Sequence, residues 1–535
     1  MKLLLSNRTT YPFTQENGIC FCGYFIYNGH KYTAEAAITH IRDRLSHISF
    51  EELLHEINYG LYSFVVETDS KVFCAVDRIR SFQFYYATEN NDLILSDSAH
   101  SVFDALSTVT ADETSFDELK LSGIFISGPH TLCNEIRGLQ SGEYFVYDKA
   151  SGTIETHFYY KIGGDGTYHD WTDEEYLDRF SEVFDKACEN LRIALAGRTA
   201  AVALSGGLDS REILLMLKRI KYEKVVCFTF GTKGHLDTEL PKKIAEEYGY
   251  QWHFVEYLPS TWKKLRKDPD FVEYITTRHN MCTVTEIQEY AAVKQLTENE
   301  ILPNDSVIIT GNTGTIIAGK LDRKFVDEQV NYQELLDFVK IRYYNRTDIP
   351  ERLNERFESY FDKTRANNSA ESAAQFLNFN IMERQFKFCL SSQAMFASLG
   401  YEALLPVCDT NFLDFAKKVP LRLRMGKKLL RDFVSRHESI GCPPSSSAVY
   451  ARVGGAIRST TLLRKIVRKT SKLTKYFRSL NRIENIFPFF KYAKHALKGS
   501  EFFTINHIFA SDMMKDTRKR ISEKQKASAK ATISM

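Results

Sequence analysis

The stretch that most constrains the fold is residues 199–219, TAAVALSGGLDSREILLMLKR. A short apolar run at 201–204 predicts a buried parallel strand. The turn at 205–207 follows it, and apolar side chains then recur with the period of a helix, at Ile213, Leu214, Leu217 and Ile220. A strand that passes through a glycine turn into a helix offers free backbone N–H groups and a favourable dipole to an anion. The sequence therefore predicts a phosphate cradle on an α/β sheet.

The side chains of this turn suit the same ligand. Gly206 and Gly207 allow the backbone to approach an oxyanion closely, and Ser205 and Ser210 add hydroxyl donors. Asp209 adds a carboxylate that can hold Mg²⁺ beside phosphates. The pattern is neither a Walker A loop nor G-x-G-x-x-G. The alternative is a glycine turn before an ordinary core helix, and the complete hexapeptide S-G-G-L-D-S between strand and helix favours the phosphate site.

Length and composition limit the class of protein. A chain of 535 residues exceeds what one core usually serves, so we expect two or three domains. Hydrophobic content of 43%, charged content of 26% and a net charge of +2 are typical of a soluble globular protein. The sequence contains no apolar run of about 18 residues and begins with no signal-peptide pattern, so we expect neither a transmembrane segment nor secretion. The ten cysteines form no C-x-x-C pair, which predicts reduced thiols and a cytoplasmic location.

The first 160 residues or so alternate β-rich runs with turns and a little helix. The β-rich runs are 18–27, 61–67, 72–77 and 84–87, and the helix-like stretches are 33–45 and 49–57. Short motifs occur in a fixed order, at 60–66, 76–81, 84–86 and 138–146. Together they resemble the amidotransferase domain of asparagine synthetases. The resemblance implies an N-terminal Ntn-type α/β/β/α sandwich over residues 1–165, in which two central sheets are flanked by helices.

The glutaminase chemistry of that domain is not expected here. Family members that hydrolyse glutamine use a cysteine at position 2, whose own α-amine serves as the base. Lys2 occupies that position, and Cys20 and Cys22 have no free amine. We interpret the domain as a structural or partner-docking module.

A boundary between two domains is expected near residue 165. The clearest linker is Gly163-Gly164-Asp165-Gly166. The pattern Thr172-x-x-Glu175 then forms a capping box that predicts a long helix to about Ala196. A second capping box, Thr283-x-x-Glu286, predicts a helix to about Leu296.

Residues 170–440 alternate strands and helices. Further strands are predicted at 225–230, 252–257 and 306–310, which indicates a doubly wound parallel sheet followed by a helical part. In such a sheet the loops at 205–210, 231–237 and 311–315 meet at the carboxyl ends of the strands, where ligands bind.

Two later motifs complete the family resemblance. The run 400–409, GYEALLPVCD, resembles the family's G-L-E-A-R-V-P-F-L-D at identical spacing, and 426–431, GKKLLR, resembles its K-x-x-L-R helix. With S-G-G-L-D-S these motifs identify a member of the asparagine synthetase family, whose second domain is an ATP-pyrophosphatase domain with a PP-loop.

The resemblance implies ATP and Mg²⁺ as cofactors, with Asp209 as metal ligand and catalytic residue. It places pyrophosphate and adenosine on one set of residues: Leu204, Ser205, Gly206, Gly207, Leu208, Asp209, Ser210, Phe230, Thr310 and Gly311. A substrate carboxylate would be activated by adenylation, and ammonia or an amine would then displace AMP from the acyl-adenylate.

Two departures from the family pattern leave the activity open. The family's S-G-E-G-A-D-E loop is replaced at 310–316 by TGNTGTI, which has no carboxylate. Where the family places a catalytic lysine, Arg452 is the only basic residue between 443 and 455. We expect Arg452 to serve as a catalytic residue that neutralises charge, although an arginine does not shuttle protons. Asparagine synthesis itself is therefore not expected.

One hypothesis is an ATP-dependent, AMP-forming carbon–nitrogen ligase acting on a small carboxylate and an amine. The other is a catalytically inactive nucleotide-binding scaffold or sensor of the same fold.

Residues 441–535 form a third segment, expected to be a basic helical extension. No acidic residue occurs between Glu438 and Glu484, whereas basic and apolar residues interleave from 452 to 482. This segment either contacts an anionic partner or forms an amphipathic helix whose charges face water, and we favour the second interpretation. A nucleic-acid partner is not expected. The tail from Lys515, rich in Lys, Ser and Ala, is predicted to be disordered.

Overall fold

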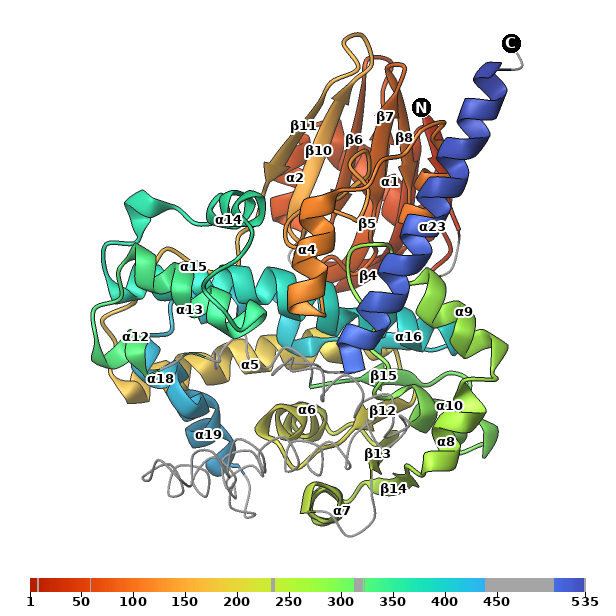
Figure 1. The fold of residues 1–535 in the computed structure, drawn as a ribbon. Coiled ribbons are helices and arrows are strands. Elements are labelled where there is room, and N and C mark those ends of the chain that lie inside the picture. The colour runs from red at the N-terminus through yellow and green to blue at the C-terminus, as the bar shows by residue number, and fades with distance from the viewer. Residues whose placement is uncertain are drawn as a thin grey trace, which may run out of the picture.

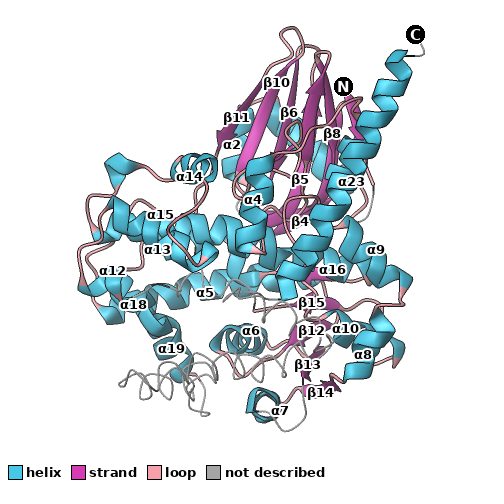
Figure 2. Cartoon of the chain, viewed as in Figure 1, coloured by secondary structure: helices cyan, strands magenta, loops and turns pink. Residues whose placement is uncertain are grey.

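A computed structural model describes residues 1–6, 9–57, 59–231, 236–311, 321, 323–437 and 505–533. The basic segment at 452–482, which includes Arg452, and the loop at 312–316 lie outside these ranges. The described chain contains two sheet systems with helices between and around them (Figures 1 and 2). We call residues 1–158 the sandwich region and residues 173–437 the parallel-sheet region.

The sandwich region is built on two sheets. One has the strand order β11-β10-β6-β5-β3-β2, with β4 beside β3, and the other has the order β1-β8-β7-β9. Side chains of both, such as Val65 and Phe145 of the first and Leu93 and Leu95 of the second, share one buried cluster, so the sheets pack face to face. The strands are β1 (Lys2–Leu4), β2 (Thr14–Glu16), β3 (Ile19–Tyr27), β4 (His30–Thr33), β5 (Tyr59–Glu67), β6 (Lys71–Val76), β7 (Tyr85–Glu89), β8 (Asp92–Ser96), β9 (Arg137–Gly138), β10 (Glu143–Asp148) and β11 (Ile154–Phe158).

Helices cover both outer faces of these sheets. α1 (Ala34–Leu45) and α2 (Phe50–Glu56) bury Ile38 and Leu53 against Phe64 of the seven-stranded sheet. α3 (Ala99–Ala105) and α4 (Glu113–Ser122) share a second cluster with Tyr85 and Ile94 of the four-stranded sheet. The layers therefore run helix, sheet, sheet, helix.

The second system is a parallel sheet, as predicted, with five strands in the order β14-β13-β12-β15-β16. Its fifth strand, at 402–404, was not predicted. Its strands are β12 (Ala200–Ala203), β13 (Val225–Gly231), β14 (Gln251–Glu256), β15 (Val307–Ile309) and β16 (Glu402–Leu404). Neighbouring residues of the central strand enter different clusters. Val202 packs with α5 (Asp173–Leu195) and α6 (Leu208–Arg219), whereas Ala201 packs with α10 (Tyr290–Glu298). Because strand side chains alternate, helices cover both faces of this sheet.

The other helices of the parallel-sheet region surround it. They are α7 (Leu236–Tyr248), α8 (Pro259–Leu265), α9 (Pro269–Thr277), α12 (Lys324–Asp327), α13 (Tyr332–Tyr344), α14 (Glu351–Glu358), α15 (Ser369–Phe379), a π-helix (Asn380–Phe388), α16 (Ser392–Ser398), α17 (Thr410–Lys417), α18 (Leu421–Arg424) and α19 (Lys428–Ser435). None of the helices in the described ranges has both the length and the apolar character needed to cross a bilayer.

One predicted capping box is confirmed and the other is wrong. At the start of α5 the Thr172 hydroxyl accepts the Glu175 N–H at 3.2 Å, while the Glu175 carboxylate accepts the Thr172 N–H at 2.7 Å. α10 instead begins at Tyr290, because the Thr283 hydroxyl donates to the Ile124 carbonyl at 3.1 Å. A contact with the sandwich region thus replaces the local cap.

The predicted glycine linker at 163–166 is a packed turn. A side chain on Gly163 would come within 2.4 Å of the Ala374 carbonyl, and one on Gly166 would meet the Glu371 backbone at 2.9 Å. Both contacts are with α15, so this connection is pressed against the helices of the parallel-sheet region.

The C-terminal tail forms a helix, α23 (Ile505–Ile533), and the prediction of disorder from Lys515 is wrong. Its buried side chains recur every three or four residues, at Ala510, Met513, Thr517 and Ile521. They pack with α3 and α4 of the sandwich region, beside which the blue helix runs in Figure 1. Ion pairs from Arg518 to Glu113 (2.6 Å) and from Arg520 to Asp104 (2.8 Å) flank this stripe. The apolar stripe is narrow, and the basic composition around it conceals it in the sequence.

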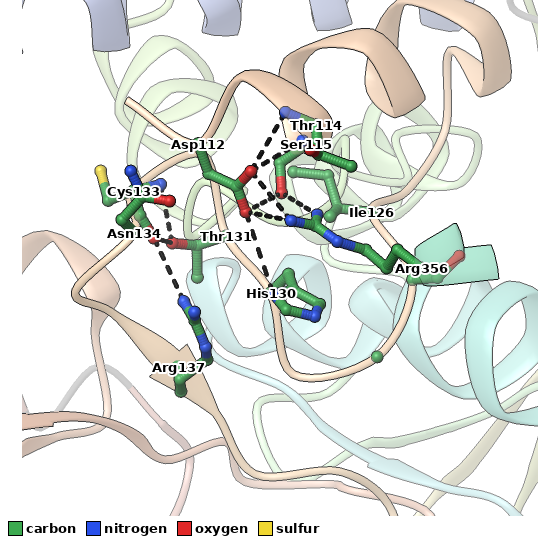
Figure 3. Close-up of polar contacts among 12 residues, drawn as sticks. Asp112, Thr114, Ser115, Ile126, His130, Thr131, Cys133, Asn134, Arg137 and Arg356 are labelled. Carbon is green, nitrogen blue, oxygen red and sulfur yellow. Dashed lines mark hydrogen bonds and ion pairs between the residues drawn. The ribbon is translucent and has the colours of Figure 1, made fainter. Parts of the chain in front are cut away.

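A buried charge cluster joins the sandwich region to α14 (Figure 3). The Asp112 carboxylate, 4% exposed, caps α4 by accepting the N–H groups of Thr114 and Ser115. Arg356 donates to both of its oxygens, at 2.9 and 2.8 Å. Burial alone would raise the pKa of Asp112, but the charge of Arg356 and the hydrogen bonds from Ser115 and Arg356 hold it below its usual value. Burial, with the nearby charges of Arg356 and Arg137, lowers the pKa of His130 to about 3, so this imidazole is neutral.

Candidate functional site

The predicted phosphate turn lies at the carboxyl edge of the parallel sheet. It follows the central strand β12 and leads into α6, as expected from the sequence. Leu204 extends the pairing, since its N–H donates to the Phe228 carbonyl at 2.8 Å. Loops that follow neighbouring parallel strands meet at this edge, which is the usual ligand position in such sheets.

Two serine hydroxyls hold the turn in shape. The Ser210 hydroxyl accepts the Ser205 N–H at 3.0 Å and donates to the Ser205 carbonyl at 2.9 Å. The Ser205 hydroxyl accepts the Gly207 N–H at 3.2 Å. Ser205 is exposed and Ser210 is buried. The turn is therefore ordered by its own side chains, with its outer surface open to solvent.

The first turn of α6 is open to an anion. Its N-cap is Gly207, and no side chain of the described chain caps it. The first N–H groups of a helix have no partner within the helix and carry its positive dipole end. Gly206, Gly207 and Leu208 are half-buried rather than covered. The arrangement suits a phosphate group.

The loop after β15 contacts this turn directly. A side chain on Gly311 would lie 2.7 Å from the Asp209 carbonyl carbon and 2.8 Å from the Ser210 nitrogen, so only glycine fits there. Thr310, beside it, is 2% exposed, and its hydroxyl has no hydrogen-bond partner among the described residues. On the other side of β12, Phe230 near the end of β13 stacks on Tyr257 with ring centroids 5.1 Å apart.

Lys427 is a site residue that sequence reasoning did not place. It comes from the K-x-x-L-R motif, 218 residues beyond Asp209, and its ammonium donates to the Asp209 carboxylate. The two side chains are 25% and 29% exposed. Lys427 adopts a left-handed backbone conformation (φ 61°) just before α19, which turns it towards α6. A cation therefore faces the region where phosphates would bind.

Glu212 is a second residue that the sequence did not single out. It follows Asp209 by three positions on α6, is 1% exposed, and its Oε1 has no hydrogen-bond partner in the described part of the chain. Burial, and secondly the negative charge of Asp209, raise its pKa to about 8, while Lys427 acts in the opposite direction. The only available signal was the i, i+3 spacing from Asp209.

The donor set at this edge fits magnesium. No group of three or more His, Cys, Asp or Glu side chains suited to a metal occurs within the described ranges. Protein Mg²⁺ sites, however, commonly use one or two carboxylates, with water and substrate phosphates completing the shell. Asp209 and the buried, unpaired oxygen of Glu212 meet that requirement.

A cavity elsewhere in the molecule does not belong to this site. It has a volume of about 70 Å³ and lies between the sandwich region and the sheet, lined by Asp97, Asn280 and Glu402 among others. Glu402 begins β16, so the cavity adjoins the amino-terminal edge of the parallel sheet.

The predicted site residues are thus largely brought together. Gly311 packs against Asp209 and Ser210 of the turn, and Thr310 and Phe230 stand at the ends of the adjoining strands. Arg452 lies outside the described residues.

Comparison with protein families agrees with this geometry. Residues 180–437 match the family model described as asparagine synthase. This part of the chain belongs to the asparagine synthase family. The match begins within α5 and ends just after α19, so it includes β12, the turn, Glu212 and Lys427. It does not extend over the sandwich region. Asparagine synthase-like proteins form a family of ATP-dependent ligases and amidotransferases, and this is the coarse class of the matched region.

Comparisons with individual proteins add little to the family match. No curated protein matches the chain. Among solved structures, an NH3-dependent NAD synthetase from Campylobacter jejuni is 11% identical over 37% of this chain and 95% of its own, with a TM-score of 0.20. A glutamine phosphoribosylpyrophosphate amidotransferase from B. subtilis is 8% identical over 58% of this chain and 65% of its own, with a TM-score of 0.19. TM-scores this low support no structural or functional argument.

Proposed function

We propose that this asparagine synthase-like protein binds ATP with Mg²⁺ at residues 204–210 and joins a small carboxylate to ammonia or an amine, releasing AMP and pyrophosphate. The observation that carries the proposal is the uncapped start of α6 behind a glycine turn, faced by Lys427 and Asp209. We also propose the division into domains at 1–165, 170–440 and 441–535, with an Ntn-type fold for the first.

The chain's residues would take distinct parts in adenylation. The N–H groups of the turn and the start of α6 bind the β- and γ-phosphates, and Lys427 adds a positive charge against the departing pyrophosphate. The face of Phe230 and the backbone at 310–311 orient the adenosine. Bound Mg²⁺, held by Asp209, would supply further charge neutralisation on the phosphates.

The two covalent steps require no additional reactant. A substrate carboxylate oxygen bonds to the α-phosphorus while the bond from that phosphorus to the bridging oxygen breaks, and pyrophosphate leaves. The amine nitrogen then bonds to the acyl carbon, the acyl–oxygen bond breaks, AMP leaves, and the amine loses a proton. Positioning and electrostatic stabilisation supply the catalysis that this site offers.

We propose that the amine is not generated from glutamine. Cys22 is fully buried in β3, and its thiol donates to the Tyr11 carbonyl at 3.3 Å. Burial raises the pKa of this thiol far above neutrality, so it is not a nucleophile. Cys20 is also buried with a raised pKa. Purified protein should release no ammonia from glutamine, and a release that Cys22→Ala abolished would overturn this part of the proposal.

Exchange of labelled pyrophosphate into ATP tests the ligase activity. Exchange should depend on the correct carboxylate, because it requires reversible formation of an acyl-adenylate. Asp209→Asn and Gly207→Val should abolish it together with the thermal stabilisation by ATP and Mg²⁺, which is about 2.7 kcal/mol at a concentration 100 times the Kd. Asp432→Asn, in an exposed ion pair on α19, is the matched control and should change neither. ATP binding without exchange for any of a broad panel of carboxylates would favour a nucleotide sensor, and a wild-type protein that ATP does not stabilise would refute the site.

A further inference from the structure

We infer that Glu212 is a second carboxylate ligand for the magnesium ion that accompanies ATP. The inference rests on the proposed function, since it takes ATP to bind at residues 204–210. It gives the ion a protein oxygen beyond Asp209, although residues 310–316 contain no acidic side chain. Glu212 belongs to a run of buried residues on α6, with Arg211 before it and Ile213 after it.

Within the described ranges, Glu212 is buried without a full set of hydrogen bonds. Its side chain is 1% exposed, and Oε1 has no hydrogen-bond partner among the described residues. A buried carboxyl group without its hydrogen bonds is unfavourable, and nearly all buried polar atoms in folded proteins are paired. Other helix residues beside it, such as Ile213 and Leu214, are fully buried hydrocarbon. A bound cation would supply the partner that the described residues do not.

Glu212 lies on the same face of α6 as Asp209. Side chains three residues apart on a helix lie on one face, with about 5–6 Å between their Cβ atoms. The negative charge of Asp209 and the positive charge of Lys427 both act on Glu212, which places all three in one small region. Two carboxylates separated in this way can reach a common cation together with its water molecules.

Further oxygen atoms lie in the loop that packs against Asp209. The Thr310 hydroxyl is also buried and unpaired in the described chain, and its neighbour Gly311 packs directly on the Asp209 backbone. Mg²⁺ prefers oxygen ligands and usually retains several waters, which such a hydroxyl can bind. Lys427 pairs with the Asp209 carboxylate when no metal is bound. When Mg²⁺ and the phosphates bind, the metal takes the place of Lys427 at Asp209, and Lys427 can then contact the phosphates.

A magnesium titration monitored by thermal unfolding tests the inference on the full chain. Wild type, Glu212→Gln and Glu223→Gln would each be melted with saturating ATP, first in EDTA and then at rising Mg²⁺. Glu223 is an exposed residue just beyond α6 and serves as the matched control. Glu212→Gln should keep the small rise in melting temperature that metal-free ATP gives. It should need at least about tenfold more Mg²⁺ than wild type to reach half of the further rise that the metal gives. Identical titrations for wild type and Glu212→Gln would overturn the inference.

A second variant keeps the inference testable if the amide substitution prevents folding. Glu212→Cys places a small, readily buried residue there, whose thiolate prefers soft metals. Cd²⁺ should restore the metal-dependent shift in Glu212→Cys where Mg²⁺ does not, and equal responses to the two metals in this variant and the wild type would overturn the inference. Failure of the proposed function looks different, because ATP would then stabilise no variant, with or without metal.

Discussion

Asp112 and Glu212 are both buried carboxyl groups near the start of a helix, and their surroundings are opposite. Asp112 caps α4, and each of its oxygens also accepts a hydrogen bond from Arg356. Glu212 lies one turn inside α6 with an unpaired oxygen and a second carboxylate as neighbour. The pKa of Asp112 is lowered and that of Glu212 is raised.

The difference separates a structural carboxylate from a functional one. Arg356 and the α4 backbone complete the shell of Asp112, so this group joins the sandwich region to α14 without any ligand. Glu212 lacks such a shell in the described chain, and its burial weakens the fold unless a partner arrives.

Asp112→Ala should reduce the free energy of unfolding by about 3–5 kcal/mol, because it leaves the Arg356 charge largely buried and unpaired. The loss of the α4 cap is included in that figure. Urea unfolding followed by circular dichroism measures the change. Asp117→Ala removes a more exposed ion pair with Arg352 on the same helix and should cost about 1 kcal/mol or less. Equal losses for the two variants would show that the Asp112 cluster has no special structural weight.

The two carboxylates should also differ in the sign of their pH dependence. The pKa of Glu212 is about 8 in the folded protein, against an ordinary value near 4.3 in an unfolded chain. Between these two pH values the folded protein keeps the Glu212 proton, whereas the unfolded chain has released it. Its contribution to stability is therefore complete at low pH and is lost as the pH rises towards 8. The Asp112 pKa is lowered on folding, so its contribution is present above pH of about 4 and is lost as the pH falls.

Metal-free urea titrations of wild type and Glu212→Gln between pH 5 and 8 measure the first of these effects. The stability of wild type relative to the variant should fall by at most about 1.4 kcal/mol per pH unit. A difference that stays constant over this range would mean that Glu212 is already paired in the folded protein.

Lys427→Met should have the smallest effect on stability, about 1 kcal/mol or less, because its ion pair with Asp209 is about a quarter exposed. The same variant should lose most of the stabilisation by ATP and Mg²⁺, since it removes the charge facing the phosphates. Lys428→Met, next to it and paired with Asp173 and Asp432, is the control and should retain ATP binding. A large loss of stability in Lys427→Met would instead make this pair a structural link like Asp112–Arg356.

The parts predicted well from sequence were those with local causes. The strand–turn–helix at β12 and α6, the capping box of Thr172 and the parallel sheet follow from short-range patterns. The Thr283 box failed because a contact with Ile124, far away in the sequence, used the hydroxyl. Local patterns cannot report such competition.

The missed site residues required knowledge of distances across the fold. Lys427 was visible as a motif, but nothing in the sequence shows that a residue 218 positions away faces Asp209. Glu212 looked like a polar position on an amphipathic helix until the packing showed that α6 is buried there. The continuation of α23 beyond Lys515 was missed because a stripe of small and apolar residues such as Thr517 and Ile521 is hard to distinguish in a basic tail.

The return of α23 to the sandwich region has a consequence for biosynthesis. Met513 and Ile521 belong to the same hydrophobic cluster as Val102 and Phe116, about 400 residues earlier in the chain. Contacts between residues so distant in sequence carry a large loop-closure entropy and slow the folding of a chain. On the ribosome, the outer face of α3 and α4 stays uncovered until the parallel-sheet region has been synthesised. Maturation of the first region therefore depends on a segment that is translated about 400 residues later.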